Sequence, residues 1–251
     1  MKPAVNLSTV FRGLERDARP AAAAAAGFTR VESWWEFSSA TPAPEDVARF
    51  VDALRAAGLE LVAINAHGGD REAGERGMAA LPDREQEFDQ SIEAVAEVHR
   101  QLGPRLFNVT FGNLRSDRWT RDEQLASAAE RYAAACERVA TFGGTLLIEP
   151  LTRDGNPDYP MRTAQDAADF LDAFLPDVPN IGVLFDTFHL AANGVELERA
   201  IDELGPRIRH VQFADFPGRG RPGTGAIDFD ALEERLDRVG YTGEISLEYL
   251  G

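Results

Sequence analysis

The feature of this sequence that most constrains its fold is a regular alternation of short apolar or β-branched runs with longer stretches of helical periodicity. Eight runs have the length and composition of strands, and seven helical stretches separate them. Such alternation is typical of βαβ units around a parallel sheet. Because no Pro- or Ser-rich linker interrupts the series, we predict one α/β domain over residues 1–251, a single (β/α)8 barrel. The predicted strands are 4–7, 30–33, 59–65, 106–110, 145–149, 181–186, 208–213 and 244–249.

Capping signals support the predicted helices. Pro44 suits a first helical position, and Gly58 follows the end of the same helix. Thr120 and Glu123 have the spacing of a capping box. The chain stops at Gly251, soon after the eighth strand, so we expect the last helix of a complete barrel to be missing. The predicted helices are 21–26, 45–57, 83–102, 120–142, one that begins near Thr163, 196–204 and 229–239.

Charge and composition exclude several classes of partner and chemistry. With 42 acidic against 26 basic residues, the net charge is -16, which repels nucleic acid and anionic membranes. There is no N-terminal signal pattern, and no apolar run approaches about 18 residues. Cys136 is the only cysteine, which predicts a cytoplasmic protein without disulfides or a thiolate zinc cluster. Lys2 is the only lysine, which excludes an aldolase with a Schiff-base lysine in the barrel.

Polar side chains that can bind a metal stand at the ends of the last four predicted strands. Active sites of (β/α)8 barrels lie at these C-terminal strand ends. Three carboxylates gathered beside an apolar barrel require a nearby positive charge, since desolvation and mutual repulsion disfavour them. An all-oxygen set without cysteine favours one hard divalent cation, Mg²⁺ or Mn²⁺, with coordination positions left for substrate oxygens. The four candidates, in chain order, are Glu149, Asp186, Gln212 and Glu248.

Three more residues are candidates for binding substrate. His189 follows Asp186 by three positions, so a helix beginning there would turn it toward the same mouth. His67 lies just past the third strand and can meet substrate from the other side of the barrel. Arg219 is preferred over Arg221 as the arginine that holds a substrate carboxylate. The alternatives are structural histidines and a solvated loop arginine.

Two further features have simpler interpretations. Trp34 and Trp35 follow the second strand, and neighbours on a strand point to opposite faces, so at most one is expected to line the pocket. His210 shares the strand parity of Gln212 and is expected to form a hydrogen bond inside the barrel.

Several motifs resemble those of the hydroxypyruvate isomerase family, and the similarity spans nearly the whole chain. The wider group is the xylose-isomerase-like barrels, in which the metal position on the seventh strand is commonly histidine. Glutamine at that position, as in Gln212, is similar to the hydroxypyruvate isomerase branch. The motifs are Ile148-Glu149-Pro150, Asp186-Thr187-Phe188-His189, His210-Val211-Gln212, Gly74-Glu75-Arg76-Gly77, Pro222-Gly223-Thr224-Gly225 and Ser246-Leu247-Glu248-Tyr249.

The resemblance implies a role for each of the four metal candidates. Glu149 and Glu248 would be both metal ligands and the proton-transferring pair, while Asp186 and Gln212 would be ligands only. The implied reaction converts hydroxypyruvate to tartronate semialdehyde through an enediolate, which requires a base, an acid and a stabilised oxyanion. The resemblance also leaves a homo-oligomer open.

Three alternatives remain at this stage. The nearest is a ketose 3-epimerase or an inosose isomerase or dehydratase that uses the same metal and glutamate pair. A metal-dependent endonuclease on a related barrel would need several zinc ions and many histidines, whereas this chain has 4 histidines and a charge of -16. A sugar- or acid-binding protein without turnover would keep the same pocket.

Overall fold

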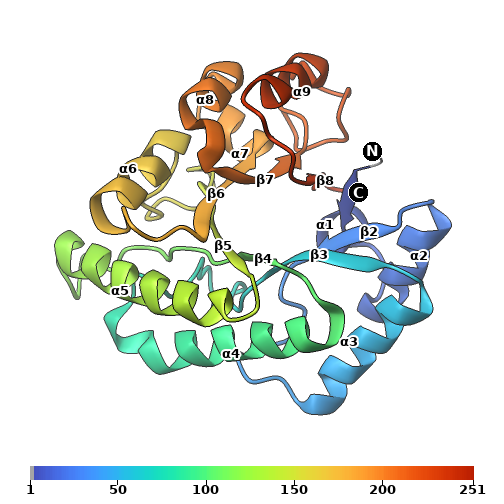
Figure 1. Cartoon of the computed structure of the whole chain (residues 1–251), viewed down its shortest axis with the longest axis horizontal. Coiled ribbons are helices and arrows are strands. Elements are labelled where there is room, and N and C mark those ends of the chain that lie inside the picture. Colours follow the sequence, from blue (N-terminus) through green and yellow to red (C-terminus); the bar gives the residue numbers. More distant parts are fainter. Residues whose placement is uncertain (1–2) are drawn as a thin grey trace.

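The computed structural model describes residues 3–251, and the strands found there close into one parallel eight-stranded barrel with the helices outside it (Figure 1). β1 closes the barrel by pairing with β8, where Val5 lies opposite Leu247. The predicted (β/α)8 fold is therefore confirmed; Lys2 lies outside the described residues. The strands are β1 (Ala4–Asn6), β2 (Arg30–Ser33), β3 (Glu60–Asn65), β4 (Leu106–Asn108), β5 (Thr145–Ile148), β6 (Ile181–Asp186), β7 (Ile208–Phe213) and β8 (Ile245–Leu247).

Strand bounds agree with the predictions for β2, β6 and β7, and the other strands are one to three residues shorter. β5 ends at Ile148, before Glu149 and Pro150, and Pro150 has no N–H with which to continue the ladder. β8 likewise ends before Glu248. Both glutamates therefore stand just past their strands, at the C-terminal mouth of the barrel.

The longer helices begin and end near their predicted positions. Pro44 is the first residue of α3, and Thr120 with Glu123 forms both halves of the predicted capping box of α5. None of the helices within residues 3–251 is long and apolar enough to span a membrane. These helices are α2 (Arg19–Ala25), α3 (Pro44–Ala56), α4 (Glu85–Leu102), α5 (Arg121–Ala140), α6 (Ala164–Phe174), α8 (Leu197–Leu204) and α9 (Phe229–Arg238).

Two short helices, α1 (Leu7–Val10) and α7 (Thr187–Ala192), start directly at strand ends. The last residue of each strand caps the helix that follows: Asn6 Oδ1 accepts the N–H of Ser8 at 2.9 Å, and Asp186 Oδ1 accepts the N–H of His189 at 3.0 Å. Helices of 4 and 6 residues are too short to show periodicity in a sequence. α7 turns the chain so that His189 stays next to Asp186.

Residues 248–251, which follow β8, form no helix. Leu250 N–H instead donates to the carbonyl oxygen of Arg219 at 2.9 Å, and Gly251 N–H donates to that of Thr9 at 3.3 Å. These bonds tie the segment after Glu248 to the loop after β7 and to α1.

Candidate active site

The four predicted metal-binding residues meet at the C-terminal mouth of the barrel, beneath a large open pocket. All four side chains are buried, with exposures between 0% and 5%. Their proximity follows from shared neighbours: Asp186 and Glu248 contact the same guanidinium, and Glu149 and Asp186 approach the same imidazole. The four are Glu149 after β5, Asp186 at the end of β6, Gln212 in β7 and Glu248 after β8.

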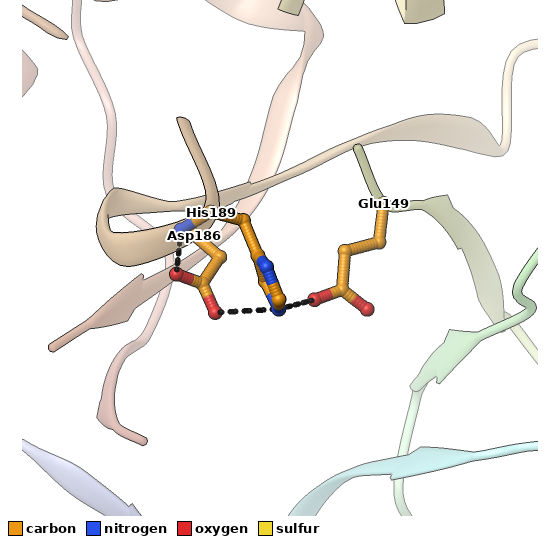
Figure 2. A group of neighbouring side chains, drawn as sticks. All are labelled: Glu149, Asp186 and His189. Carbon is orange, nitrogen blue, oxygen red and sulfur yellow. Dashed lines mark hydrogen bonds and ion pairs between the residues drawn. The ribbon is translucent and has the colours of Figure 1, made fainter. Parts of the chain in front are cut away.

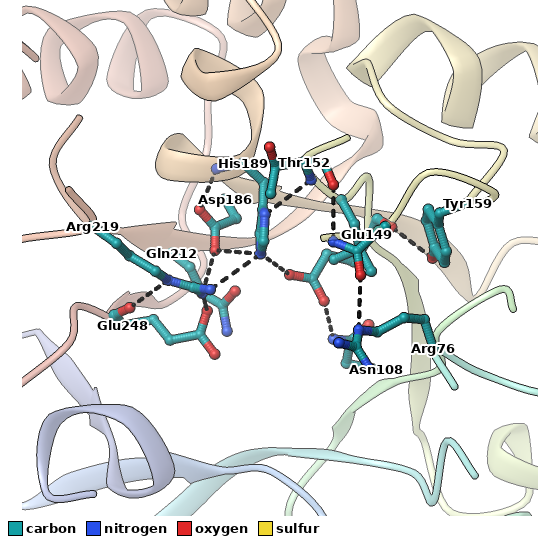
Figure 3. Close-up of polar contacts among 12 residues, drawn as sticks. Arg76, Asn108, Glu149, Thr152, Tyr159, Asp186, His189, Gln212, Arg219 and Glu248 are labelled. Carbon is teal, nitrogen blue, oxygen red and sulfur yellow. Dashed lines mark hydrogen bonds and ion pairs between the residues drawn. The ribbon is translucent and has the colours of Figure 1, made fainter. Parts of the chain in front are cut away.

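Arg219 places its guanidinium among these carboxylates (Figure 3). Nη2 donates to Asp186 Oδ2 at 3.1 Å and to Glu248 Oε2 at 2.5 Å, and Nε donates to the backbone oxygen of Glu248 at 3.2 Å. Its backbone has φ 54°, a conformation uncommon for residues other than glycine. The structure thus places Arg219 against two of the predicted ligands, where its charge is already compensated.

His189 faces Glu149 and Asp186, with Nε2 3.8 Å from a carboxylate oxygen of each (Figure 2). Thr152 N–H donates to Nδ1 at 3.0 Å, so in the neutral ring Nε2 carries the hydrogen. Burial lowers the pKa of His189 to about 4, which keeps the ring neutral at neutral pH. The approach of Arg219 Nη1 to Nε2, 3.3 Å, is therefore a contact between two donors. Nε2–H remains available to donate to a substrate oxygen.

Burial controls the ionisation of the acidic residues. Burial first, and then the charge of Asp186, raises the pKa of Glu149 to about 7. Burial also raises the pKa of Glu248 well above its ordinary value. For Asp186 burial acts in the same direction, but His189 and Arg219 outweigh it, and the net pKa is lowered. The cluster as a whole favours a positive charge placed among its oxygens.

A buried network beneath the site includes two residues that were not predicted from the sequence, Glu32 and Asn6. Glu32 Oε1 accepts from Gln212 Nε2 at 2.7 Å and from Asn6 Nδ2 at 2.9 Å, and Glu32 Oε2 lies 2.6 Å from His210 Nε2. Asn6 Nδ2 also donates to Glu248 Oε1 at 3.0 Å. The predicted interior hydrogen bond of His210 is confirmed. Polar residues near the ends of the first two predicted strands were the signal that could have revealed Glu32 and Asn6.

Gln212 has the orientation expected of a metal ligand. Its Nε2 donates to Glu32, and its Oε1 is buried with no hydrogen-bond partner within the described residues. Buried acceptors are rarely left without a partner, and a cation would satisfy this one. Ligand atoms of Glu149, Asp186 and His189 also lie within 4.8 Å of one another. Because His189 Nε2 carries the ring hydrogen, the donor set that fits a hard cation consists of the three carboxylates and the Gln212 oxygen.

Glu149 is positioned from two sides (Figure 3). Asn108 Nδ2 donates to its carboxylate Oε2 at 2.6 Å, and Tyr159 Oη donates to its backbone oxygen at 2.9 Å. The fully buried Tyr159 also accepts the N–H of Phe111 at 3.0 Å. These bonds hold one oxygen of Glu149 away from the centre and leave the other, Oε1, toward His189.

The opposite wall of the pocket contains His67. Its Nε2 lies 3.3 Å from Glu87 Oε1 on α4, and burial lowers the pKa of the imidazole. His67 therefore lines the pocket as predicted for a substrate contact, while one ring nitrogen is already held by a carboxylate.

Both tryptophans after β2 line the pocket, so the expectation that at most one would do so is wrong. β2 ends at Ser33, and the alternation of faces does not extend beyond the strand. Trp34 Nε1 donates to Glu248 Oε1 at 2.8 Å, whereas Trp35 Nε1 donates to the backbone oxygen of Ser39 at 2.8 Å. Only Trp34 of the two bonds to the acidic cluster.

Comparison with known proteins identifies the family of this barrel. Residues 20–251 match the family described as xylose isomerase-like TIM barrel. The chain belongs to this family. It is 37% identical over 249 residues to a Streptomyces coelicolor protein provisionally named hydroxypyruvate isomerase, a match that covers 98% of this chain and 89% of the relative. It is 33% identical over 249 residues to a 2-oxo-tetronate isomerase of Pectobacterium atrosepticum, covering 99% and 91%.

A solved structure from Brucella melitensis, described as an AP endonuclease of family 2, superposes with a TM-score of 0.87 at 30% identity. The match covers 99% of this chain and 93% of that one. Solved ketose 3-epimerases share the barrel at 18% to 23% identity, which shows the fold alone. The predicted family and the predicted enzyme class, an isomerase, are confirmed.

Proposed function

We propose that this protein is a metal-dependent isomerase that interconverts hydroxypyruvate, or a close oxo-acid, with the isomeric aldehyde. For hydroxypyruvate the product is tartronate semialdehyde. The observation that carries the proposal is the pair of buried glutamates, Glu149 and Glu248, that line one pocket beside Asp186. Relatives named for isomerases of hydroxypyruvate and 2-oxo-tetronate support the same substrate class.

In this proposal the three carboxylates and Gln212 Oε1 hold one Mg²⁺ or Mn²⁺. When bound, the cation polarises the substrate carbonyl and the neighbouring hydroxyl. One of Glu149 and Glu248 removes a proton from C3 of hydroxypyruvate, and the other delivers a proton to C2. The hydroxyl proton passes from O3 to O2, so the conversion is balanced without a redox partner.

Neighbouring side chains assist these transfers. Asn108 holds one oxygen of Glu149, while Trp34 and Asn6 hold Oε1 of Glu248, so each base has a fixed orientation. In this proposal His189 Nε2–H donates to a substrate oxygen, and Arg219 holds the carboxylates of Asp186 and Glu248 in place. His67 on the opposite wall completes the proposed substrate contacts.

A nuclease function, suggested by the description of the Brucella melitensis relative, has less support. The net charge of -16 repels a phosphate backbone. Among the described residues, the acidic cluster is approached by His189 and not by the several histidines of a multi-zinc site.

A cytoplasmic location and a homo-oligomer remain predictions; the single thiol, Cys136, is buried and agrees with a reducing compartment.

The test is proton NMR of hydroxypyruvate in deuterated buffer, with purified protein and Mg²⁺ beside a chelated control. We expect tartronate semialdehyde, with deuterium entering at carbon, in the sample that contains protein and Mg²⁺ and not in the chelated control. Exchange without net product would support the proton-transfer machinery and redirect the search to other oxo-acids. The absence of both product and deuterium exchange would contradict the proposal. Ketoses and inososes would then be assayed next.

A further inference from the structure

Arg71 is a cation that lines the pocket and, among the described residues, is not in contact with a carboxylate. It lies on the loop between β3 and α4, and its side chain has no hydrogen-bond or ion-pair partner among residues 3–251. Its guanidinium carbon stands 4.0 Å from the centroid of the Trp34 ring. A guanidinium stacked on an aromatic face keeps the N–H groups in its plane available for a planar carboxylate.

Trp34 connects Arg71 to the reacting groups. The ring that supports Arg71 also donates its Nε1–H to Glu248 Oε1 at 2.8 Å. Arg71 lines the same pocket as Glu149 and His189, and its charge lowers the pKa of both. Burial by the pocket walls, and then the nearby Arg76, lower the pKa of Arg71, and the charges of Glu149 and Glu248 act in the opposite direction without outweighing them.

The other arginines on the pocket wall differ from Arg71 in one of two ways. Most already bond to an acceptor within the protein. Arg153 on the loop after β5 has no side-chain partner among the described residues, but its charge is not among the main causes of the pKa shifts of Glu149 and Glu248. The arginines with partners are Arg16, Arg76, Arg84 and Arg219.

The loop that holds Arg71 is ordered by its own hydrogen bonds. Asp70 Oδ1 accepts the N–H groups of Glu72 at 2.9 Å and Ala73 at 3.0 Å. The backbone oxygen of Arg71 accepts from Arg76 Nη1 at 3.2 Å. A cation on an ordered loop loses less conformational entropy when it binds a ligand.

We propose that Arg71, stacked on Trp34, binds the carboxylate of a short oxo-acid while the reacting carbons lie over Glu149 and Glu248. The assignment rests on the proposed isomerase function and adds the group that selects an acid over a neutral ketose. It also differs from the sequence-based choice of Arg219 for the carboxylate, since Arg219 is already paired with two carboxylates. Arg71 offsets the repulsion that the acidic cluster exerts on an anionic substrate.

The test compares two substrates that differ only at the recognised end. Hydroxypyruvate carries a carboxylate where dihydroxyacetone carries a hydroxymethyl group. The Arg71→Gln variant should have a kcat/KM for hydroxypyruvate about 10- to 100-fold lower, which corresponds to the loss of a hydrogen bond between charged groups. Its kcat/KM for dihydroxyacetone should change less than about threefold. Arg71→Lys should restore part of the loss. Arg153→Gln, which removes a charge from the same pocket wall, should leave both substrates within about twofold.

Equal losses on both substrates, or equal losses in the Arg71 and Arg153 variants, would overturn the assignment. Calorimetric measurement of glycerate binding, with glycerol as the neutral control, tests the Arg71 assignment independently of the proposed function. If wild-type protein turns over neither substrate, the isomerase proposal fails while the binding result still decides about Arg71. Glycerate affinity reduced in Arg71→Gln and unchanged in Arg153→Gln supports the carboxylate site, and unchanged affinity in both rejects it.

Discussion

Two loops at the mouth of the barrel each present an arginine to the pocket, yet the two arginines are in opposite electrostatic states. The loop after β3 presents Arg71, and the loop after β7 presents Arg219. Arg219 is bound by Asp186 and Glu248, whereas Arg71 stacks on Trp34 without an ion pair among residues 3–251. The comparison shows that neighbouring carboxylates, and not residue type or loop composition, determine which guanidinium is available to a ligand.

An aspartate orders each loop, and the two aspartates differ in how many backbone N–H groups they accept. Asp70 accepts two backbone N–H groups through one carboxylate oxygen. Asp215 uses both oxygens to accept four, from Phe216, Gly223, Gly225 and Ile227, at 2.8 to 3.1 Å. The loop of Arg219 is therefore held more completely than the loop of Arg71. This agrees with Arg219 as part of the fixed site and Arg71 as the ligand-facing group.

Among these changes Glu248→Gln should have the largest effect on activity, because it removes a proposed proton-transfer carboxylate that is paired with Arg219. An amide cannot transfer the proton, so kcat should fall about 1,000-fold or more, while the amide keeps the size of the side chain. Steady-state kinetics of hydroxypyruvate isomerisation measures the loss, and circular dichroism checks the fold. A rate near that of the wild type would remove Glu248 from proton transfer.

Removal of the cation should have the next largest effect. At about 100 times its Kd, a divalent ion that binds the folded state stabilises it by about 2.7 kcal/mol, which is about 5–10 °C in melting temperature. Calorimetric melting with Mn²⁺ and after chelation measures the shift. Asp186→Asn should abolish the shift, and Arg71→Gln should retain it. Identical melting curves and turnover with and without metal would contradict the metal site.

Arg219→Met should tighten Mn²⁺ binding roughly tenfold, because the guanidinium competes with a cation for Asp186 and Glu248 and also repels it. Arg71→Met should change the affinity less than about threefold, since Arg71 contacts neither carboxylate. Electron paramagnetic resonance of free Mn²⁺ measures both. Weaker binding in Arg219→Met would show that the guanidinium supports the ion instead of competing with it.

Asp215→Asn should lower the melting temperature by a few degrees at pH 7, the smallest of these effects. Burial alone would raise the pKa of Asp215, but the four N–H donors outweigh it, and the net pKa is lowered. A lowered folded-state pKa contributes stability above the unfolded value of about 3.9, and that stability is lost as pH falls through the folded value.

Melting curves at pH 7 and below about pH 4 therefore test the role of Asp215, because the gap between wild type and Asp215→Asn should narrow in acid. Asp70→Asn, which affects two N–H bonds and not four, is the matched comparison and should shift melting less. A constant gap across this pH range would show that ionisation of Asp215 does not stabilise the loop.

Much of the site could be predicted because strand ends are local features of a sequence. The last residues of four consecutive predicted strands include Glu149, Asp186, Gln212 and Glu248, and parallel strands of a barrel end at one mouth. Their proposed roles as ligands and proton-transfer groups still await experiment. Trp34 could not be assigned, because the alternation rule stops where β2 stops.

The partners of these residues could not be predicted, because they come from distant parts of the chain. Asn6 and Glu248 are 242 positions apart, and Glu32 and Gln212 are 180 apart. Both pairs depend on barrel closure between β1 and β8 and on the register of the strands. Arg71 lies in a loop without periodicity, where nothing local marks it as different from Arg76.

The sequence by itself determined the barrel, most helix boundaries and the four strand-end residues, since periodicity, capping and strand position are properties of short segments. Only the tertiary structure decided the ring hydrogen of His189, the orientation of the Gln212 amide, and which of Arg71 and Arg219 is compensated. These outcomes depend on distances between side chains from different strands and loops, because hydrogen bonds and ion pairs act over a few ångströms in space and not along the chain.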